Sequence, residues 1–426
     1  MNIRGNEARC TSCHAGYGWK NDDFDFTDQS SIDCLVCHDQ THTYKKWPPG
    51  AGYPVEEPKK FKGKKMFYPP DYNKVAQSVG RPDRKNCGTC HFYGGGGDGV
   101  KHGDLDSSLV DPSKSLDVHM NSEGANFTCV RCHTTDAHKI AGRCYKKPAA
   151  EELKSLIDDD LIDRITCVSC HTSQPHKPGH KANDHTDKVA CQSCHIPEFA
   201  RVLPTKMMWD WSTAGDLKDG KPYAKTGDYG KHSYATIKGT FRWEKNVVPQ
   251  YFWFNGELDY TLLTDTIDPS EPVELNKVVG DKDDPRSRIY PFKVHVGKQP
   301  YDKGNNTMAA LHLFSPKEDD AYWGSFDWQK AISSGMRMMG LDYSGEYDFV
   351  DTLYYFQITH MVAPKEDSLE CSQCHSRHGR LANLAGFYMP GRDFSSSLNI
   401  IGWLVVIGSL VGVIIHGALR AVTSKK

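Results

Sequence analysis

The chain has 426 residues and a formal net charge of −2, and 38% of its residues are hydrophobic. The near-neutral charge gives no indication of a partner such as nucleic acid or a charged membrane surface, and no nucleic-acid partner is expected. The hydrophobic content is low for a chain long enough to form two or three domains, so a source of buried apolar surface other than side chains is needed.

Seven Cys-x-x-Cys-His motifs account for fourteen of the fifteen cysteines. In this motif two thiols form thioethers with one porphyrin edge, and the adjoining imidazole binds the iron. Zinc sites also use Cys-x-x-Cys pairs but place no requirement on the next residue, so seven successive histidines argue against zinc. The sequence therefore predicts haem c as cofactor, and we expect the haem-free chain not to fold. The motifs are Cys10/Cys13/His14, Cys34/Cys37/His38, Cys87/Cys90/His91, Cys129/Cys132/His133, Cys167/Cys170/His171, Cys191/Cys194/His195 and Cys371/Cys374/His375.

Thirteen further histidines lie outside the motifs, about enough to give each low-spin iron a second axial ligand with some to spare. As these ligands we expect His42, His119, His138, His176, His185, His232, His312 and His360. The other five are His102, His180, His295, His378 and His416.

In chain order, residues 1–198 form a domain with six motifs and connections rich in Gly and Pro, in which 148–165 is predicted to be a helix. Residues 199–365 form an insertion without motifs, read as loops and strands that supply distal histidines. Within it, two helices are expected near 328–339 and 348–361. Residues 366–391 carry the seventh motif, which we expect to return to the others. The predicted fold class is mainly α and irregular, packed around haems, with few short strands.

A linker, 392–397, precedes an uncharged apolar run at 398–419 that is long enough to cross a bilayer. The alternative is a buried core helix. The basic tail, 420–426, predicts a cytoplasmic C-terminus and an extracytoplasmic haem domain. His416 lies inside this run and either ligates a haem of a partner cytochrome b or packs against another helix.

The chain opens with MNIRGNEARC, which has no apolar signal region, although haem attachment requires export. We therefore expect a further segment upstream of Met1.

Several strings resemble the octahaem tetrathionate reductase family of c-type cytochromes. They are RCTSCHAGYGWK with FDFTD, DCLVCHD, NCGTCHFYGGGGDGVKHGDLDSSL, KVACQSCHIPEFAR and VAPKEDSLECSQCHSRHGRL. The resemblance implies an eighth haem encoded upstream and one catalytic haem, on Cys10 and Cys13, whose iron is bound by a lysine. The other haems are implied to be electron carriers with two histidine ligands.

For that lysine the leading candidate is Lys101, in the glycine-rich loop, with Lys146 and Lys147 as alternatives. A desolvated amine can lose its proton and bind iron. Asp98 and His102 are expected beside this site, where Asp98 could deliver protons or order substrate. Cys144, outside the motifs, is either a buried free thiol or the partner of a cysteine in the upstream segment.

Three functions stay open at this point. The first is reduction of a small inorganic substrate, for which the resemblance implies tetrathionate, nitrite or hydroxylamine. The second is electron transfer alone, from a quinol-oxidising membrane subunit such as a cytochrome b to extracytoplasmic acceptors. The third is hydroxylamine oxidation.

Overall fold

The computed structural model describes residues 11–21, 23–48, 50–61, 65–136, 138–141, 165–315, 320–393 and 395–424. It divides into two compact units, Met1–Ser368 and Leu369–Lys426. The predicted helix at 148–165 lies, except for its last residue, outside the described residues, as do Cys10, Cys144, Lys146 and Lys147.

The helices of the first unit are mostly single turns, and several of them are the haem-attachment motifs themselves. One turn of helix brings residues i and i+3 to the same face, which is what two thiols on one porphyrin edge require. The helices are α2 (Cys34–His38), α3 (Tyr72–Gln77), α4 (Arg84–His91), α6 (Val168–His171), α7 (Cys191–His195), α8 (Tyr322–Ser325) and α9 (Trp328–Met339). The 3-10 turns are η1 (Gln29–Ser31), η2 (Ser107–Val110), η3 (Cys129–Arg131), η5 (Lys181–His185), η6 (Asp228–Gly230) and η7 (Lys365–Asp367).

The insertion at 199–365 forms a nine-stranded sheet, with the order β13-β17-β15-β5-β10-β9-β8 and with β11 and β16 also paired to β15. Its strands are β5 (Thr205–Asp210), β8 (Ala224–Thr226), β9 (His232–Ala235), β10 (Gly239–Glu244), β11 (Gln250–Phe254), β13 (Val273–Glu274), β15 (Arg288–Asp302), β16 (Thr307–Met308) and β17 (Tyr347–Gln357). Four two-stranded ribbons are β1 (Lys59–Phe61) with β2 (Lys65–Phe67), β3 (Thr135–Asp136) with β4 (Lys139–Ile140), β6 (Leu217–Lys218) with β7 (Lys221–Pro222), and β12 (Glu257–Tyr260) with β14 (Asn276–Val279).

This sheet corrects the predicted fold class, which allowed only few short strands. The predicted helix at 348–361 is wrong as well, because 347–357 form the long strand β17. It pairs antiparallel with β15 over eleven positions, from Phe292 opposite Gln357 to Asp302 opposite Tyr347. Aromatic and β-branched residues dominate this stretch, and such residues pack well on a pleated surface.

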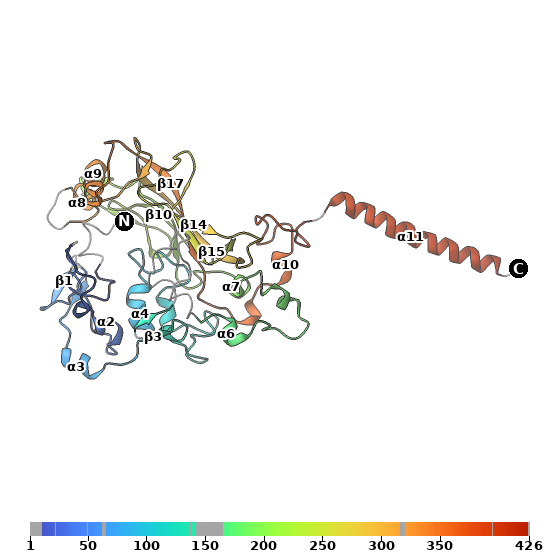
Figure 1. Ribbon diagram of the computed structural model, residues 1–426, viewed down its shortest axis with the longest axis horizontal. Helices are drawn as coiled ribbons and strands as arrows, with labels where there is room; N and C mark the ends of the chain where they lie inside the picture. Colours follow the sequence, from blue (N-terminus) through green and yellow to red (C-terminus); the bar gives the residue numbers. More distant parts are fainter. Residues whose placement is uncertain are drawn as a thin grey trace. The chain divides into compact units, whose positions relative to one another are not determined.

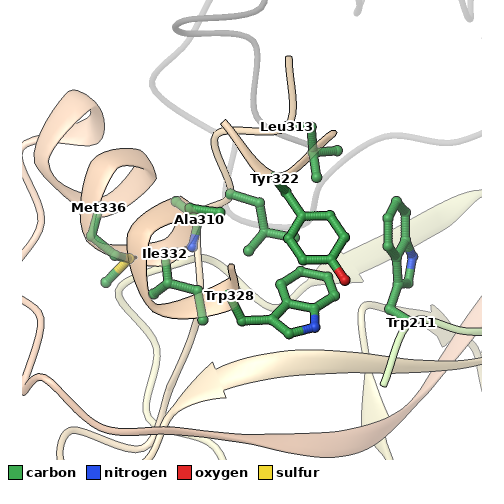
Figure 2. Close-up of a cluster of buried hydrophobic side chains, with 9 residues drawn as sticks. Trp211, Ala310, Leu313, Tyr322, Trp328, Ile332 and Met336 are labelled. Carbon is green, nitrogen blue, oxygen red and sulfur yellow. Dashed lines mark hydrogen bonds between the residues drawn. The ribbon is translucent and has the colours of Figure 1, made fainter. Parts of the chain in front are cut away.

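Helices α8 and α9 lie against the sheet near β10 and β17 (Figure 1). The predicted helix at 328–339 is confirmed as α9, which begins after the capping side chain of Asp327 and ends at Gly340 in a left-handed conformation. Figure 2 shows the core that α9 closes, in which the Tyr322 and Trp328 rings stack with centroids 3.8 Å apart. This apolar core contains no haem motif, so the insertion has a packed core of its own.

The second unit contains the helix of the seventh motif, α10 (Cys371–Cys374), and α11 (Ser396–Thr423). Helix α11 has 28 residues and a mean hydropathy of 2.5 over its apolar window, so its length and composition would allow it to cross a membrane. The Ser395 side chain caps its first turn by accepting from Leu398 N.

Candidate functional site

Four motif histidines each face a second imidazole at one common spacing. The ring centroids are 6.3 Å apart for His38 and His138, 6.0 Å for His171 and His119, 6.2 Å for His133 and His360, and 6.3 Å for His195 and His176. With metal–nitrogen bonds of about 2 Å, two imidazoles on one iron have ring centres roughly 6.3 Å apart. We call these the four imidazole pairs; their spacing fits two axial ligands on one haem iron.

In three of the four pairs, a hydrogen bond at Nδ1 fixes the orientation of at least one ring. When Nδ1 carries the proton and donates it, Nε2 is left free to bind a metal. The acceptors are Gly80 O for His38 at 2.9 Å, Ala141 O for His133 at 3.0 Å, Asn183 Oδ1 for His176 at 3.2 Å and Asp104 Oδ2 for His360 at 3.1 Å. The donor set therefore suits iron ligation on chemical grounds as well as by spacing.

Neighbouring motifs touch through their cysteines, which gives the motifs an order in space. Thiols of different motifs lie within hydrogen-bonding distance, or close enough to interact electrostatically. The hydrogen-bonded contacts are Cys13 with Cys90, Cys87 with Cys129, and Cys167 with Cys191, and the electrostatic contacts are Cys132 with Cys170 and Cys37 with Cys87 and Cys90. Porphyrins attached to these thiols would lie in a row that runs from the first motif through the third, fourth and fifth to the sixth, with the second motif beside the third.

Several predicted haem-binding residues belong neither to these thiol contacts nor to the four imidazole pairs, namely Cys34, Cys194, Cys371, Cys374, His14, His91 and His375. Cys194 is half-buried and lies one turn after Cys191 on α7, so the two thiols can reach one porphyrin edge. His375, in the second unit, has its Nδ1 3.0 Å from Pro390 O, and a proton donated there leaves Nε2 free for iron. The attachment role of Cys194 and the ligand role of His375 stay predictions, as does the return of the seventh motif to the others.

The row ends at the motif of Cys10, Cys13 and His14, which we call the end motif. Within the described part of the chain, the His14 ring packs edge-on against Trp19 at 4.6 Å and faces no second imidazole. The nearby polar group is the amine of Lys46, whose side chain is 5% exposed. Its Nζ donates to the carbonyl oxygens of His14 and Gly16, the latter at 2.9 Å.

A buried polar network holds Lys46 in this position. Asp33 Oδ2 lies 3.4 Å from Lys46 Nζ and accepts a hydrogen bond of 2.9 Å from the Tyr44 hydroxyl. The Tyr44 hydroxyl is in turn 2.9 Å from that of Tyr17. Burial lowers the pKa of Lys46, against the opposing effect of Asp33.

The sequence singled out Lys101, and the structure places it in the glycine-rich loop beside the third motif. Its Nζ lies 5.7 Å from the centre of the Phe356 ring, and its charge acts on His91. The His102 ring packs against the same phenylalanine at 5.3 Å, and burial lowers the pKa of His102 to about 4. Asp98 accepts from the backbone and hydroxyl of Ser107, so it holds the first residue of the turn η2. The roles predicted for these three residues stay predictions.

The remaining predicted ligands have other neighbours. His42 Nε2 is 3.1 Å from Asp83 Oδ2, and the buried His312 bonds Ser334 and Asp320 beside α9. His185 Nδ1 bonds Lys181 O at 3.1 Å, whereas His232 is exposed on β9. None of these contacts is with a motif histidine, and their ligand roles also stay predictions.

Two buried lysines of the sheet were not foreseen. Lys293 on β15 is fully buried and donates to Val100 O, Lys101 O and Thr205 Oγ1, which fastens the glycine-rich loop to the sheet. Lys206 on β5 is 3% exposed and lies over aromatic rings. Desolvation lowers the pKa of Lys293 to about 7 and that of Lys206 to about 6. Nothing in the sequence distinguishes either lysine from solvated ones.

Comparisons with known proteins agree with this site. Residues 206–378 match the family model described as "Cytochrome c bacterial". The structure is similar to the crystal structure of an octaheme cytochrome c from Shewanella oneidensis, with a TM-score of 0.77 and 46% identity over 89% of this chain and 80% of that one. An uncharacterized protein of Archaeoglobus fulgidus is 28% identical over 138 residues, which is 31% of this chain and 46% of the archaeal protein. Haem c is accordingly the cofactor of the motifs.

Proposed function

Because the chain belongs to the multihaem c-type cytochromes, in the family of the octaheme cytochrome c of Shewanella oneidensis, we propose that it reduces a small inorganic substrate at its end motif. Tetrathionate, nitrite and hydroxylamine form the proposed substrate class. Haem c, when bound, supplies one-electron oxidation and reduction at each iron.

The observation that carries the proposal is the difference between the end motif and the four motifs with imidazole pairs. In those four, a second imidazole opposite the motif histidine would fill both axial positions and leave no room for substrate. His14 instead has Trp19 and the buried amine of Lys46 as neighbours. His91 of the third motif also lies outside the four pairs, and the buried amine beside His14 is the reason we place the substrate at the end motif.

Lys46 is accordingly the lysine we propose at the catalytic haem, with Lys101 as the alternative. Burial lowers the pKa of Lys46, which favours a neutral amine able to bind a metal. When protonated, the same amine attracts anions such as tetrathionate and nitrite. Tyr17, Tyr44 and Asp33 connect Lys46 to further polar groups, and such a hydrogen-bonded chain can move protons to a substrate that takes up both protons and electrons.

The experiment that distinguishes the proposed roles of the two lysines replaces each with methionine in the full-length holoprotein. For K46M we expect at least a tenfold loss of nitrite, hydroxylamine and tetrathionate reduction, together with carbon monoxide binding to one more ferrous haem than in the wild type. K101M, the matched variant, should keep wild-type rates. The reverse result would assign the role to Lys101, and no change in either variant would refute both Lys46 and Lys101 as the ligand.

The second candidate is electron transfer alone, and α11 is the observation that favours it. We propose that α11 anchors the protein with its haem domain on the extracytoplasmic side and its tail in the cytoplasm. Electrons would then come from a quinol-oxidising partner such as a cytochrome b. A reduced protein that binds no carbon monoxide, with all haems low spin, would favour this conduit over the reductase and over hydroxylamine oxidation.

His416 in α11 is a proposed contact to that partner. Replacing His416 with alanine should slow haem reduction by quinol in native membranes. Unchanged quinol-linked reduction would leave it a packing residue.

A further inference from the structure

One of the four imidazole pairs is bonded to a buried carboxylate. Asp104 is 1% exposed, and its Oδ2 accepts hydrogen bonds from Thr359 N at 2.8 Å, His360 N at 3.0 Å and His360 Nδ1 at 3.1 Å. Three N–H groups converging on one oxygen require an acceptor, so this oxygen belongs to an ionised carboxylate. Asp104 thus orients His360 and places a negative charge directly behind its ring.

The other pairs have no such charge behind the imidazole where an Nδ1 partner is described. His38 and His133 donate to the backbone carbonyls of Gly80 and Ala141, and His176 to the side-chain amide of Asn183. All of these acceptors are neutral. The haem of the fourth motif, held by His133 and His360, is therefore electrostatically distinct from the others.

We propose that Asp104 gives the haem between His133 and His360 the lowest reduction potential of the haems held by the four imidazole pairs. Reduction converts ferric to ferrous iron by adding one electron, and a nearby buried negative charge disfavours that gain. A carboxylate on Nδ1–H also makes the imidazole a stronger donor, which stabilises the ferric state further. Asp104 is a positioning residue, because it acts on the iron through His360. The inference rests on His133 and His360 sharing one iron.

The place of this haem in the row gives the low potential a consequence. Cys129 lies against Cys87 of the third motif, and Cys132 lies near Cys170 of the fifth. Electrons that pass between the end motif and the sixth motif therefore cross the fourth. A low-potential haem at that point makes the transfer of an electron onto it uphill and the transfer off it downhill, so electrons would reside mainly on its neighbours.

The test is a spectroelectrochemical titration of the full-length holoprotein with Asp104→Asn. We expect one couple to rise in potential so that its ferric-to-ferrous ratio changes at least tenfold at fixed potential, which is 59 mV for one electron. The comparison variant is Asp117→Asn. Asp117 is also buried and its charge also acts on His360, but it bonds backbone N–H groups, those of His119, Met120, Met361 and Val362, and not the imidazole, so a smaller shift is expected.

A shift of one couple in D104N that is larger than the shift in D117N supports the proposal. An unchanged titration of D104N with all haems low spin would overturn it, and so would an equal shift in D117N. If D104N releases His360 and a high-spin signal appears, the titration is made on Asp104→Glu, which keeps the charge. That variant should retain the low-potential couple, and its loss in a fully low-spin D104E would overturn the proposal.

A separate variant tests the pair on which the inference rests. His360→Gly should produce one high-spin haem. Without that signal, the pairing of His133 with His360 fails, and the tuning by Asp104 fails with it, whereas the lysine at the end motif is unaffected.

Discussion

Removing one distal imidazole should leave one haem iron without its second axial ligand and leave the other haems unchanged. His119 lies 6.0 Å from His171, ring centre to ring centre, and its own ring stacks on Phe127 at 6.2 Å. His119→Gly deletes the ring but keeps the backbone turn, in which Asp117 accepts from the amide of residue 119. One of the seven encoded haems should then change from low to high spin, so about one seventh of the low-spin signal is lost.

The assay is electron paramagnetic resonance of the oxidised protein, with optical spectra of the reduced form in carbon monoxide. The deleted ring leaves a gap of imidazole size between Phe127 and His171, so added imidazole should restore the low-spin signal. His378→Gly, at an exposed position in the second unit, is the control and should change neither spectrum. A fully low-spin H119G protein without added imidazole would refute the assignment of the imidazole pairs.

Three further results are expected. Lys206 has a pKa of about 6 in the folded protein, against an ordinary value of 10.5. Between these two pH values the unfolded chain binds one proton more than the folded chain, so the free energy of unfolding rises by about 1.4 kcal/mol per pH unit. Lys206→Met should flatten this rise, measured by thermal unfolding at pH 6.5 and 9.5. Gly239 has a φ of +81°, and an added Cβ would lie 2.0 Å from Asp210 O, so Gly239→Ala should cost at least about 1–3 kcal/mol, and a melting temperature equal to wild type would contradict this. A chain that ends at Gly391 lacks α11 and should be recovered in the soluble fraction without detergent, whereas the full chain should stay with the washed membranes. If the two chains were found in the washed membranes in equal amounts, α11 would not be the anchor.

Features set by neighbouring residues were predictable from the sequence. The motifs are read directly from the chain, and α9 has its capping Asp327, its apolar spacing and its terminal Gly340 within a short segment. The error at 348–361 has the opposite cause. Strand β17 is decided by its pairing with β15, whose paired residues lie 45 to 65 positions upstream and leave no local signal.

The candidate site divides in the same way. His119, His138, His176 and His360 were all predicted as ligands, but the motif that each one faces depends on the fold. Lys46 could not be recognised at all, because it follows the exposed Lys45 and only the burial of its amine sets it apart. Asp104 likewise resembles its acidic neighbours until His360, 256 positions away, is placed against it.

The distance along the chain between His133 and His360 has a consequence for how the protein matures. With the export and the pairing proposed above, the cysteines of the fourth motif would emerge well before His360, and their haem could be attached while its second ligand is still on the other side of the membrane. For that interval the iron would lack a ligand and be exposed to oxidants and stray ligands. Completion of the fourth haem would then wait for the sheet to fold, since His360 follows shortly after β17.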